Sequence, residues 1–184
     1  LHAAALKHVP ICEQHPADAI KTNILGTKII AENAIQFKTK IMAIISTDKA
    51  VDPTNFMGAS KRAAEIYIQN LDREKSNTNF ITVRFGNVLG STGSVVPVFQ
   101  NQILRGGPIK VTHKDTTRFF MSVKEAVELV LISLSNSVNI KEKGGINVLE
   151  MGEPMRIDDL AKQLARLSGL TPGKDIKIIY TGLR

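Results

Sequence analysis

A short run of almost entirely apolar residues between two long helical patterns constrains the fold of this chain most. Residues 40–45 read Lys-Ile-Met-Ala-Ile-Ile, which is typical of a parallel strand buried on both faces of a sheet. Residues 16–37 before it and residues 59–74 after it carry apolar side chains at helical spacing. Strand and helix patterns that alternate in this way predict an α/β fold.

The same alternation continues to the end of the chain. Gly106-Gly107-Pro108 breaks one helical pattern, and a polar turn is predicted across residues 136–145. The remaining predicted elements are strands at 80–84, 109–112, 145–149 and 176–180, and helices at 97–105, 123–134 and 157–167.

Composition sets further limits on the kind of protein. The chain has 184 residues, enough for a domain with a real core, and 43% of them are hydrophobic. No stretch approaches the roughly 18 unbroken apolar residues of a membrane span, and no signal peptide is visible. Cys12 is the single cysteine, which excludes an internal disulfide and favours a reducing, cytoplasmic location. The four histidines lack metal-ligand spacing, so no metal site is predicted.

The excess of positive charge favours an anionic small molecule over nucleic acid as the partner. Lys and Arg number 24 against 17 Asp and Glu, but these charges are scattered singly and aromatic residues make up only 5%. A nucleotide diphosphate suits such a surface at least as well as a nucleic acid does.

Both ends of the sequence indicate a segment of a longer protein. The chain begins Leu1-His2-Ala3 without an initiator methionine and ends abruptly at Arg184. A dinucleotide-binding half normally opens with a strand, G-x-G-x-x-G and a helix, and no such fingerprint occurs. We therefore expect the C-terminal part of a Rossmann-like, doubly wound parallel sheet, without its glycine-loop strands, together with a small substrate-binding subdomain.

Two neighbouring stretches in the middle of the chain carry the most chemistry, namely residues 46–49 (Ser-Thr-Asp-Lys) and residues 57–61 (Met-Gly-Ala-Ser-Lys). Met57 and Lys61 lie four residues apart, on one face of the predicted helix. Methionine has no titratable proton. Met57 therefore cannot act as an acid or a base, and the neighbouring candidates for proton transfer are Asp48 and Lys49.

Phrases spread over the whole chain, in order, resemble the CapD-like polysaccharide biosynthesis family. This family is a branch of the extended short-chain dehydrogenases and includes UDP-N-acetylglucosamine 4,6-dehydratases. In most of that superfamily the place of Met57 is taken by a tyrosine. The phrases are residues 2–10 (HAAALKHVP), 21–27 (KTNILGT), 46–51 (STDKAV), 53–58 (PTNFMG), 84–90 (RFGNVLG), 93–97 (GSVVP), 117–122 (TRFFMS) and 181–184 (TGLR).

The resemblance implies net dehydration of a UDP-sugar with bound NAD(P). A hydride passes from C4 to the cofactor, a base removes the C5 proton, and the C6 hydroxyl leaves as water with help from an acid. The hydride then returns to C6. By this resemblance Asp48 is the acid, which needs a raised pKa that burial beside a sugar would supply, and Lys49 is the base. Thr47 bonds the C4 oxygen, Lys61 holds the nicotinamide ribose, and Met57 shapes an apolar wall.

Further roles follow from the same resemblance. Ala4, Ser46 and Phe85 line the cofactor together with Lys61. The residues expected to contact the UDP-sugar are Lys7, Asn87, Val96, Pro97, Lys110, Arg118 and Arg184. Residues 1–95 are assigned to the second half of the NAD(P)-binding domain, and residues 96–184 mainly to substrate binding, interleaved with it.

Each role has a plainer alternative. Asp48 can cap a turn, Lys49 and Lys61 can be surface lysines, Asn87 can be a turn residue, and either arginine can form a surface ion pair. We expect Asn23 to be structural and to bond the backbone between helix and sheet.

The sequence therefore predicts a UDP-N-acetylhexosamine 4,6-dehydratase of the C5-retaining type, acting in surface polysaccharide biosynthesis. The alternatives are a 4-epimerase or reductase of the same superfamily, or a non-catalytic fragment. We expect this segment alone to be inactive, to belong to a homo-oligomer, and to contact neither nucleic acid nor membrane. A longer parent protein would reach a membrane through its N-terminal region.

Overall fold

The chain divides into two compact units, which are described separately. The computed structural model describes residues 1–74, 77–137 and 143–182. The first unit comprises residues 1–85 and 127–150, and the second comprises residues 86–126 and 151–184. The assignment from sequence placed one boundary after residue 95, whereas the chain changes unit after Phe85 and returns to the first unit at Val127.

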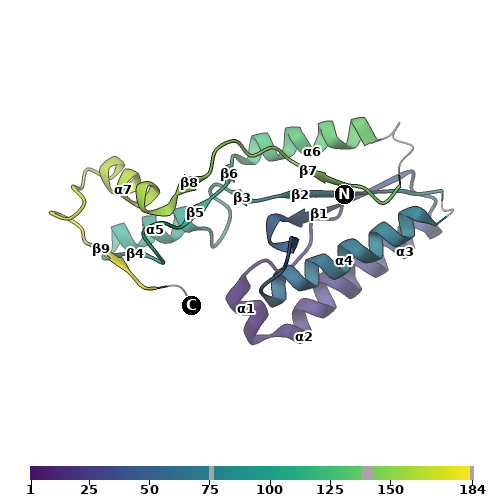
Figure 1. Ribbon diagram of the computed structural model, residues 1–184, viewed down its shortest axis with the longest axis horizontal. Coiled ribbons are helices and arrows are strands. Elements are labelled where there is room, and N and C mark those ends of the chain that lie inside the picture. Colours follow the sequence, from purple (N-terminus) through teal and green to yellow (C-terminus); the bar gives the residue numbers. More distant parts are fainter. Residues whose placement is uncertain (75–76, 138–142, 183–184) are drawn as a thin grey trace. The chain divides into compact units, whose positions relative to one another are not determined.

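A parallel three-stranded sheet forms the centre of the first unit (Figure 1). Its strand order is β1-β2-β7, with Ser46 opposite Arg84 and Thr47 opposite Phe85. The helices α3 and α4 lie on one side of this sheet and α6 on the other (Figure 1). The elements are α1 (Val9–Gln14), α2 (Pro16–Ala19), the π-helical η1 (Ile20–Leu25), α3 (Gly26–Gln36), β1 (Ile41–Thr47), the 3₁₀ turn η2 (Asp48–Ala50), α4 (Phe56–Arg73), β2 (Asn79–Phe85), α6 (Val123–Ser137) and β7 (Ile146–Val148).

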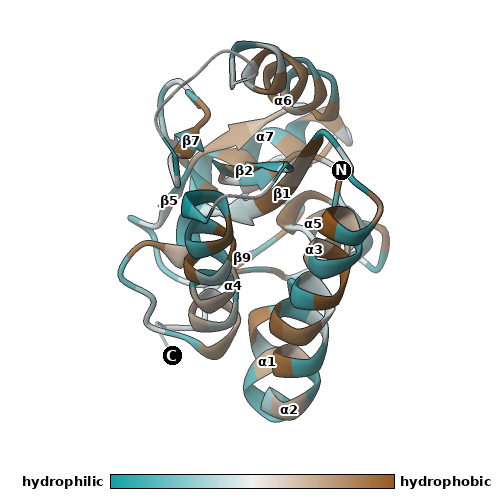
Figure 2. Ribbon diagram, turned by 90° about the vertical axis from the view of Figure 1, so that its right-hand side faces the viewer, coloured by the Kyte–Doolittle hydropathy of each residue, from teal (hydrophilic) through white to brown (hydrophobic). Residues whose placement is uncertain are grey.

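Apolar side chains at helical and strand spacing build the core of this unit. Met42 and Ile44 of β1 pack with Ala31 of α3, Ile68 of α4 and Phe80 of β2. Hydrophobic and hydrophilic residues alternate along α3 and α4, as in amphipathic helices (Figure 2). The buried strand predicted at residues 40–45 is therefore confirmed, as are the helices on either side of it.

In the described part of the second unit, residues 86–126 and 151–182, the chain forms three strand pairs, the helices α5 and α7, and the beginning of α6. The pairs β3–β6 and β4–β9 are parallel, and β5–β8 is antiparallel. Its core gathers apolar side chains of α5 and α7 with those of β4, including Phe99, Ile109, Val111 and Ala161. The elements are β3 (Asn87–Val88), α5 (Val95–Leu104), β4 (Ile109–Val111), β5 (Thr117–Arg118), β6 (Phe120–Met121), β8 (Met155–Arg156), α7 (Ile157–Leu167) and β9 (Ile178–Tyr180).

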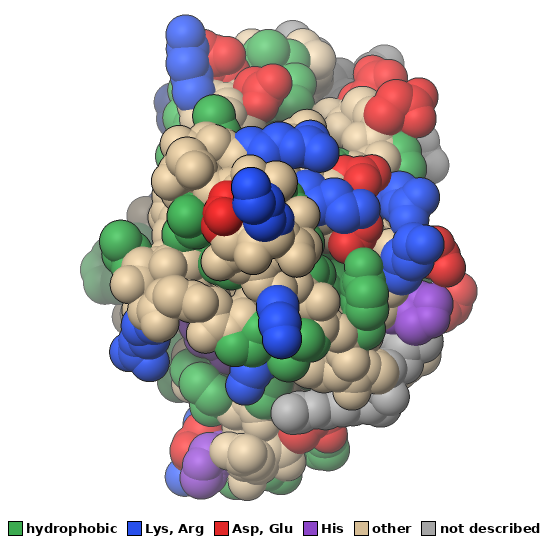
Figure 3. Space-filling model, turned by 90° about the vertical axis from the view of Figure 1, so that its left-hand side faces the viewer, with side chains coloured by type: hydrophobic (Ala, Val, Ile, Leu, Met, Phe, Trp, Pro, Cys, Tyr) green, Lys and Arg blue, Asp and Glu red, His purple; other side chains and the backbone are tan. Residues whose placement is uncertain are grey.

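The α/β class and all of the longer predicted elements are confirmed. The sequence patterns missed α1 and the two-residue strands, because such short elements show no periodicity. Part of the polar turn predicted at 136–145 lies outside the described residues. Within the part of the chain that the structure describes, no helix has both the length and the hydropathy that crossing a bilayer requires. Lys and Arg side chains stand among Asp and Glu side chains on the face shown in Figure 3.

Candidate active site

Three predicted catalytic residues form one hydrogen-bonded chain where β1 ends. The Thr47 hydroxyl donates to Asp48 Oδ1 at 2.8 Å, and Lys49 Nζ donates to the same oxygen at 2.9 Å. Thr47 Oγ1 also accepts a bond from the Lys49 backbone N–H at 3.4 Å, which caps η2. The Asp48 and Lys49 side chains remain 39% and 30% exposed, so a ligand can reach both.

The close approach of helix α4 to this turn depends on a glycine. A Cβ added to Gly58 would lie 2.1 Å from the Lys49 carbonyl oxygen and 3.2 Å from Pro53 Cβ. The first turn of α4 is fixed at the same place, because Asn55 Oδ1 accepts a bond from the Gly58 N–H at 2.8 Å. The sequence analysis did not single out Gly58, although a glycine inside a helical pattern is a signal of close packing.

Lys61 lies almost fully buried beneath the end of β1. Its side chain projects from α4 and Nζ donates to the Ile45 carbonyl oxygen at 2.6 Å, while the residue is 9% exposed. Burial lowers the pKa of the Lys61 ammonium below its usual value, and the negative charge of Glu65 opposes that change. The structure thus places Lys61 next to the strand that ends at Thr47 and leads into Asp48 and Lys49 of η2.

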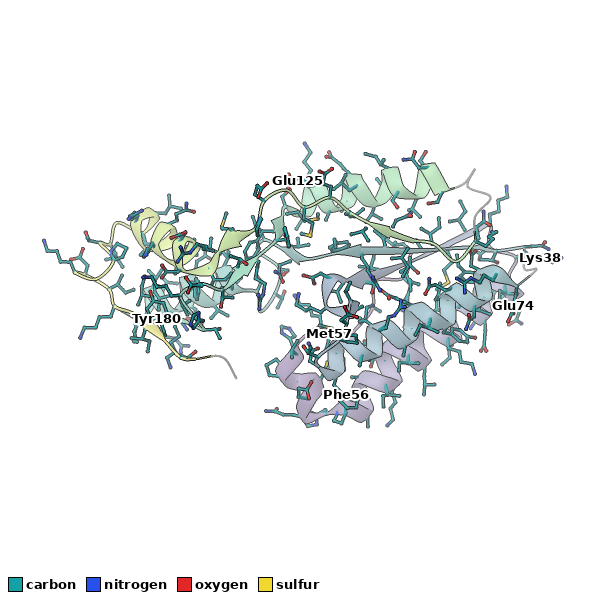
Figure 4. The ribbon with its side chains drawn as sticks, in the orientation of Figure 1. Lys38, Phe56, Met57, Glu74, Glu125 and Tyr180 are labelled. Carbon is teal, nitrogen blue, oxygen red and sulfur yellow. The ribbon has the colours of Figure 1, made fainter. Side chains whose placement is uncertain are left out.

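Met57 occupies a packed position at the start of α4 (Figure 4). It is 4% exposed and packs with Cys12 and Ala19, with Leu6 and Val9 against the same cluster. Its thioether therefore anchors α1 and α2 to α4. A wall formed by Met57 over a nicotinamide stays a prediction.

The protonation expected of Asp48 differs from what the structure favours. Burial raises the pKa of the Asp48 carboxyl, but the hydrogen bond and charge of Lys49 and the bond from Thr47 outweigh it, so the pKa is lowered. The raised pKa that an acid needs is therefore not a property of the site as it stands. It would require a change around the Asp48–Lys49 pair.

The predicted cofactor residues lie at the carboxyl ends of the strands. A parallel bridge joins His2 to Ile44, so the segment that contains Ala4 and Lys7 runs toward the same end of β1 as Ser46. Ala4 and Lys7 are exposed, and Phe85 lies opposite Thr47 on β2. Ser46 is buried and its hydroxyl donates to Glu65 Oε1 at 2.5 Å.

Asn23 is structural, as predicted. Its carbonyl oxygen accepts from the Leu6 N–H at 2.8 Å, and its amide donates to the Leu6 carbonyl at 3.0 Å and to Ser60 Oγ at 2.9 Å. The side chain is fully buried and joins the segment after His2 to α4.

Replacement of Asn23 by alanine is expected to lower the free energy of unfolding by about 2–3 kcal/mol, because its fully buried side chain would no longer bond the Leu6 N–H, the Leu6 carbonyl and Ser60. Urea denaturation of this chain measures the change. Asn33→Ala is the matched control: Asn33 is exposed on α3, and its replacement is expected to change stability by less than about 0.5 kcal/mol. Equal losses in the two variants would contradict the structural role of Asn23.

Two of the predicted substrate residues lie close together in the second unit. Asn87 of β3 is paired with Phe120 of β6, and its amide donates to the Phe119 carbonyl at 3.2 Å. Arg118 directly precedes Phe119 and is exposed. Its guanidinium donates to the Thr117 carbonyl at 2.7 Å. The Asn87 amide on β3 and the Arg118 guanidinium on β5 thus both lie near Phe119, although their strands belong to different two-stranded sheets.

Three further predicted substrate residues, Val96, Pro97 and Lys110, lie elsewhere in the second unit. Val96 and Pro97 lie in the first turn of α5, and Lys110 is exposed on β4. After β9 the chain continues alongside β4, because the Thr181 N–H donates to the Val111 carbonyl at 2.9 Å. Arg184 itself lies outside the described residues. Among the described residues, no three His, Cys, Asp or Glu side chains gather closely enough to hold a metal ion.

Sequence reasoning missed the charged residue that organises the interior of this site. Glu65 of α4 is fully buried and accepts bonds from Ser46, Arg62 and Arg84. The sequence shows only that Glu65 lies four residues after Lys61 on the same helix face, a spacing that does not reveal that Glu65 is buried.

Known proteins similar to this chain include two polysaccharide biosynthesis proteins and a nucleotide-sugar epimerase. CapD of Staphylococcus aureus, a capsular polysaccharide biosynthesis protein, is 52% identical over 183 residues. EpsC of Bacillus subtilis, a probable polysaccharide biosynthesis protein, is 52% identical over 184 residues. Each alignment covers 100% of this chain, which spans 30% of the length of either relative. A UDP-glucose 4-epimerase of Rickettsia rickettsii is 44% identical over 137 residues, covering 73% of this chain and 40% of its own length.

Solved structures share the fold. Pen from Bacillus thuringiensis has a TM-score of 0.86 at 36% identity, over 99% of this chain and 56% of its own. The dTDP-glucose 4,6-dehydratase DesIV from Streptomyces venezuelae, solved with NAD bound, has a TM-score of 0.83 at 17% identity. It matches 100% of this chain and 62% of its own, and at that identity it supports the fold alone.

The family comparison covers the whole chain. The polysaccharide biosynthesis protein family matches residues 1–184, which include the Thr47–Lys49 turn, Lys61 and the strands that present Asn87 and Arg118. This chain belongs to the polysaccharide biosynthesis protein family.

Proposed function

We propose that this chain is part of a nucleotide-sugar-modifying enzyme, a UDP-N-acetylhexosamine 4,6-dehydratase that uses NAD(P) in surface polysaccharide synthesis. The observation that carries the proposal is the hydrogen-bonded chain of Thr47, Asp48 and Lys49, next to the buried Lys61. A carboxyl and an amine in contact suit an elimination, which needs both an acid and a base. Similarity to CapD and EpsC supports the biological setting.

The residues at the end of β1 fit a nicotinamide ribose. Within residues 1–74, 77–137 and 143–182, Lys61 Nζ meets one hydrogen-bond acceptor, the Ile45 carbonyl. An ammonium has three donors, so Lys61 retains the capacity to bind ribose hydroxyls. Ser46, Phe85 and Ala4 would line the same place. When bound, NAD(P) would supply the group that accepts the hydride from C4 of the sugar and gives it back at C6.

Asp48 and Lys49 can manage both protons of the elimination. In the active form Lys49 is an amine, which takes the C5 proton, and Asp48 is a carboxylic acid, which protonates the leaving C6 hydroxyl. These two transfers leave an ammonium and a carboxylate, the ion pair that the structure contains at 2.9 Å. Transfer of one proton from Lys49 Nζ to Asp48 Oδ1 forms this active pair before the reaction, and exclusion of water by a bound sugar favours the transfer because both charges then lose solvation. After the elimination Lys49 returns its proton to C5 and becomes an amine again. The proton released by the C4 hydroxyl in the first oxidation then recharges Lys49 and restores the resting ion pair.

The second unit is proposed to bind the UDP group. Asn87 on β3 and Arg118 on β5 carry hydrogen-bond donors close to Phe119, and a guanidinium matches the geometry of a diphosphate. Arg184, Lys110 and the α5 residues Val96 and Pro97 complete the predicted set, with Lys7 from the first unit. Residues 1–95 and 96–184 keep the cofactor and substrate roles assigned to them from the sequence.

The stereochemical outcome is proposed from Met57. Because this side chain is apolar and packed among Cys12 and Ala19, it offers no second proton donor or acceptor. One base at C5 is consistent with return of the proton to the face from which it left, which retains the configuration.

A 4-epimerase is the second candidate. The Rickettsia rickettsii relative, named a UDP-glucose 4-epimerase, supports it. Epimerisation inverts C4 and conserves mass, whereas 4,6-dehydration removes one water and turns C6 into a methyl group. The two reactions are therefore separable by their products.

The test uses the longer protein that contains this chain, incubated with UDP-N-acetylglucosamine and NAD⁺. Proton NMR and mass spectrometry should show loss of water and a new C6 methyl signal. A product of unchanged mass with inverted C4 would support the epimerase. Unchanged sugar would reject both reactions and favour a role in binding alone.

Binding of UDP tests the assignment of the second unit in this chain itself. Arg118→Ala is expected to weaken UDP binding by about 10- to 100-fold, because a charge-assisted hydrogen bond contributes roughly 1.5–3 kcal/mol. Isothermal calorimetry measures the affinity, with Arg105→Ala, an exposed arginine just after α5, as the control. No UDP binding by the unaltered chain, or equal weakening in both variants, would contradict the assignment.

A further inference from the structure

The interior of the first unit contains a carboxylate that the proposed reaction does not use. Glu65 is 0% exposed and lies on the face of α4 that meets the sheet. Its two oxygens accept from Ser46 Oγ at 2.5 Å, from Arg84 Nε at 2.7 Å and Nη2 at 2.5 Å, and from Arg62 Nη1 at 3.1 Å. A buried carboxylate with so many donors is fixed in place, since losing any of them would leave charge unpaired.

These bonds connect the helix to the ends of two strands. Ser46 on β1 and Arg84 on β2 are partners in the parallel register, so Glu65 reaches both strands at the same level. The next residues along β1 are Thr47 and the Asp48–Lys49 pair. The position of the catalytic turn relative to α4 therefore depends on Glu65.

Lys61 holds the adjacent residue of the same strand. Lys61 Nζ donates to the Ile45 carbonyl, while the Ser46 hydroxyl donates to Glu65 one helical turn further along α4. The two side chains thus hold consecutive residues of β1 from one face of the helix. An ammonium buried this deeply requires a counter-charge, and Glu65 supplies it from within the same helix.

Glu65 on α4 is the charge that acts on Lys61 most directly, and His2 in the first segment is coupled to Lys61 as well. Negative groups stabilise the ammonium and positive groups oppose it. The other charged groups on the elements that meet here are paired with one another or with Glu65, namely Asp48 and Lys49 in η2, Arg62 on α4 and Arg84 on β2.

We propose that Glu65 is a positioning residue of the active site, which keeps Lys61 in its ammonium form and fixes Ser46 and the end of β1 for the cofactor. The effect of Glu65 on catalysis rests on the proposed function. The effect of the Glu65 charge on the pKa of Lys61 does not rest on it, because it can be measured on this chain without cofactor or substrate.

The experiment is an NMR titration of the lysine side chains in this chain, labelled with ¹³C and ¹⁵N lysine. Lys61→Arg identifies the Lys61 signal by its disappearance. Glu65→Gln is expected to lower the pKa of Lys61 by about one unit or more, because burial then acts without its opposing charge. Arg84→Met is expected to raise it, because a neighbouring positive charge is removed. Glu32→Gln, an exposed carboxyl on α3, is the control and should leave it unchanged.

Shifts of the Lys61 pKa in opposite directions in Glu65→Gln and Arg84→Met support the proposal. If the substitutions only loosened the packing around Lys61, its pKa would rise toward the usual value of a lysine in both variants. Shifts of the same sign, or no shift in Glu65→Gln, overturn the proposal.

If Glu65→Gln does not fold, Arg62→Gln replaces it, since the Arg62 side chain is 38% exposed. Loss of this cation should raise the pKa of Lys61, and an unchanged value overturns the proposal. Failure of the longer protein to convert UDP-sugar would reject the proposed function and leave this titration unaffected.

Discussion

Replacement of Lys49 by methionine in the longer protein is expected to reduce turnover of UDP-N-acetylglucosamine by about 10²- to 10⁴-fold, the usual contribution of a general base. Methionine keeps the length of the side chain and removes its amine, so no group at this place can take the C5 proton. The Lys49 side chain is not assigned to the diphosphate, and KM should change little. Steady-state kinetics of product formation by NMR measures both values.

Lys40→Met is the matched control, because Lys40 is exposed and immediately precedes the same strand. Its turnover should equal that of the unaltered protein. A second readout comes from this chain alone. Without the Lys49 charge, burial is opposed only by weaker bonds, so Lys49→Met should raise the pKa of Asp48 above its value in the unaltered chain. Normal turnover together with an unchanged pKa of Asp48 would remove the basis for the acid–base pair.

The titration of Asp48 shows where reasoning from the sequence reaches its limit. The order Thr47-Asp48-Lys49 is enough to place a carboxyl and an amine side by side. It does not show whether the amine turns back onto the carboxyl, which depends on the 3₁₀ turn after β1. Burial alone would raise the pKa of Asp48. Because Lys49 does turn back, its hydrogen bond and charge act together with the bond from Thr47, and the pKa is lowered.

The pairing of the strands in the sheet was less predictable from the sequence than the positions of the helices and strands themselves. Long helices and the apolar strand β1 repeat a period over many residues, and the sequence located them well. The strand β7 has three residues, and its apolar pattern carries no information on its partner. The chain returns to pair with β2 at Thr82, Val83 and Arg84, so segments on both sides of residues 86–126 belong to the first unit.

The buried charges of Glu65 were missed for a different reason. A glutamate four residues after a lysine on a helix reads as an exposed pair of small energetic value. Its burial follows from Arg84, a residue of a strand nineteen positions later in the chain, which donates two bonds to it. Tertiary pairing of this kind leaves no periodic signal in one sequence.

Gly58→Ala is expected to lower the free energy of unfolding by about 1–3 kcal/mol, the usual effect of forcing extra atoms into a packed interior. In an unhindered helix the same change stabilises by about 0.5–1 kcal/mol. Here the new Cβ would lie 2.1 Å from the Lys49 carbonyl oxygen and 3.1 Å from its carbon. Both atoms are backbone, so the turn that contains Asp48 has to move or the helix has to shift.

The same substitution at Gly26, Gly26→Ala, is expected to raise the free energy of unfolding instead of lowering it. Gly26 begins α3 with helical backbone angles, and an added Cβ would approach the Lys21 carbonyl only to 3.6 Å, an ordinary contact. Urea denaturation should therefore show Gly26→Ala stabilised and Gly58→Ala destabilised. In the longer protein the Gly58 variant should also lose turnover, since displacement of the Lys49 backbone separates the acid–base pair from Lys61. If both variants gain stability, α4 does not press on this turn, and the arrangement from which the proposed reaction is derived is wrong.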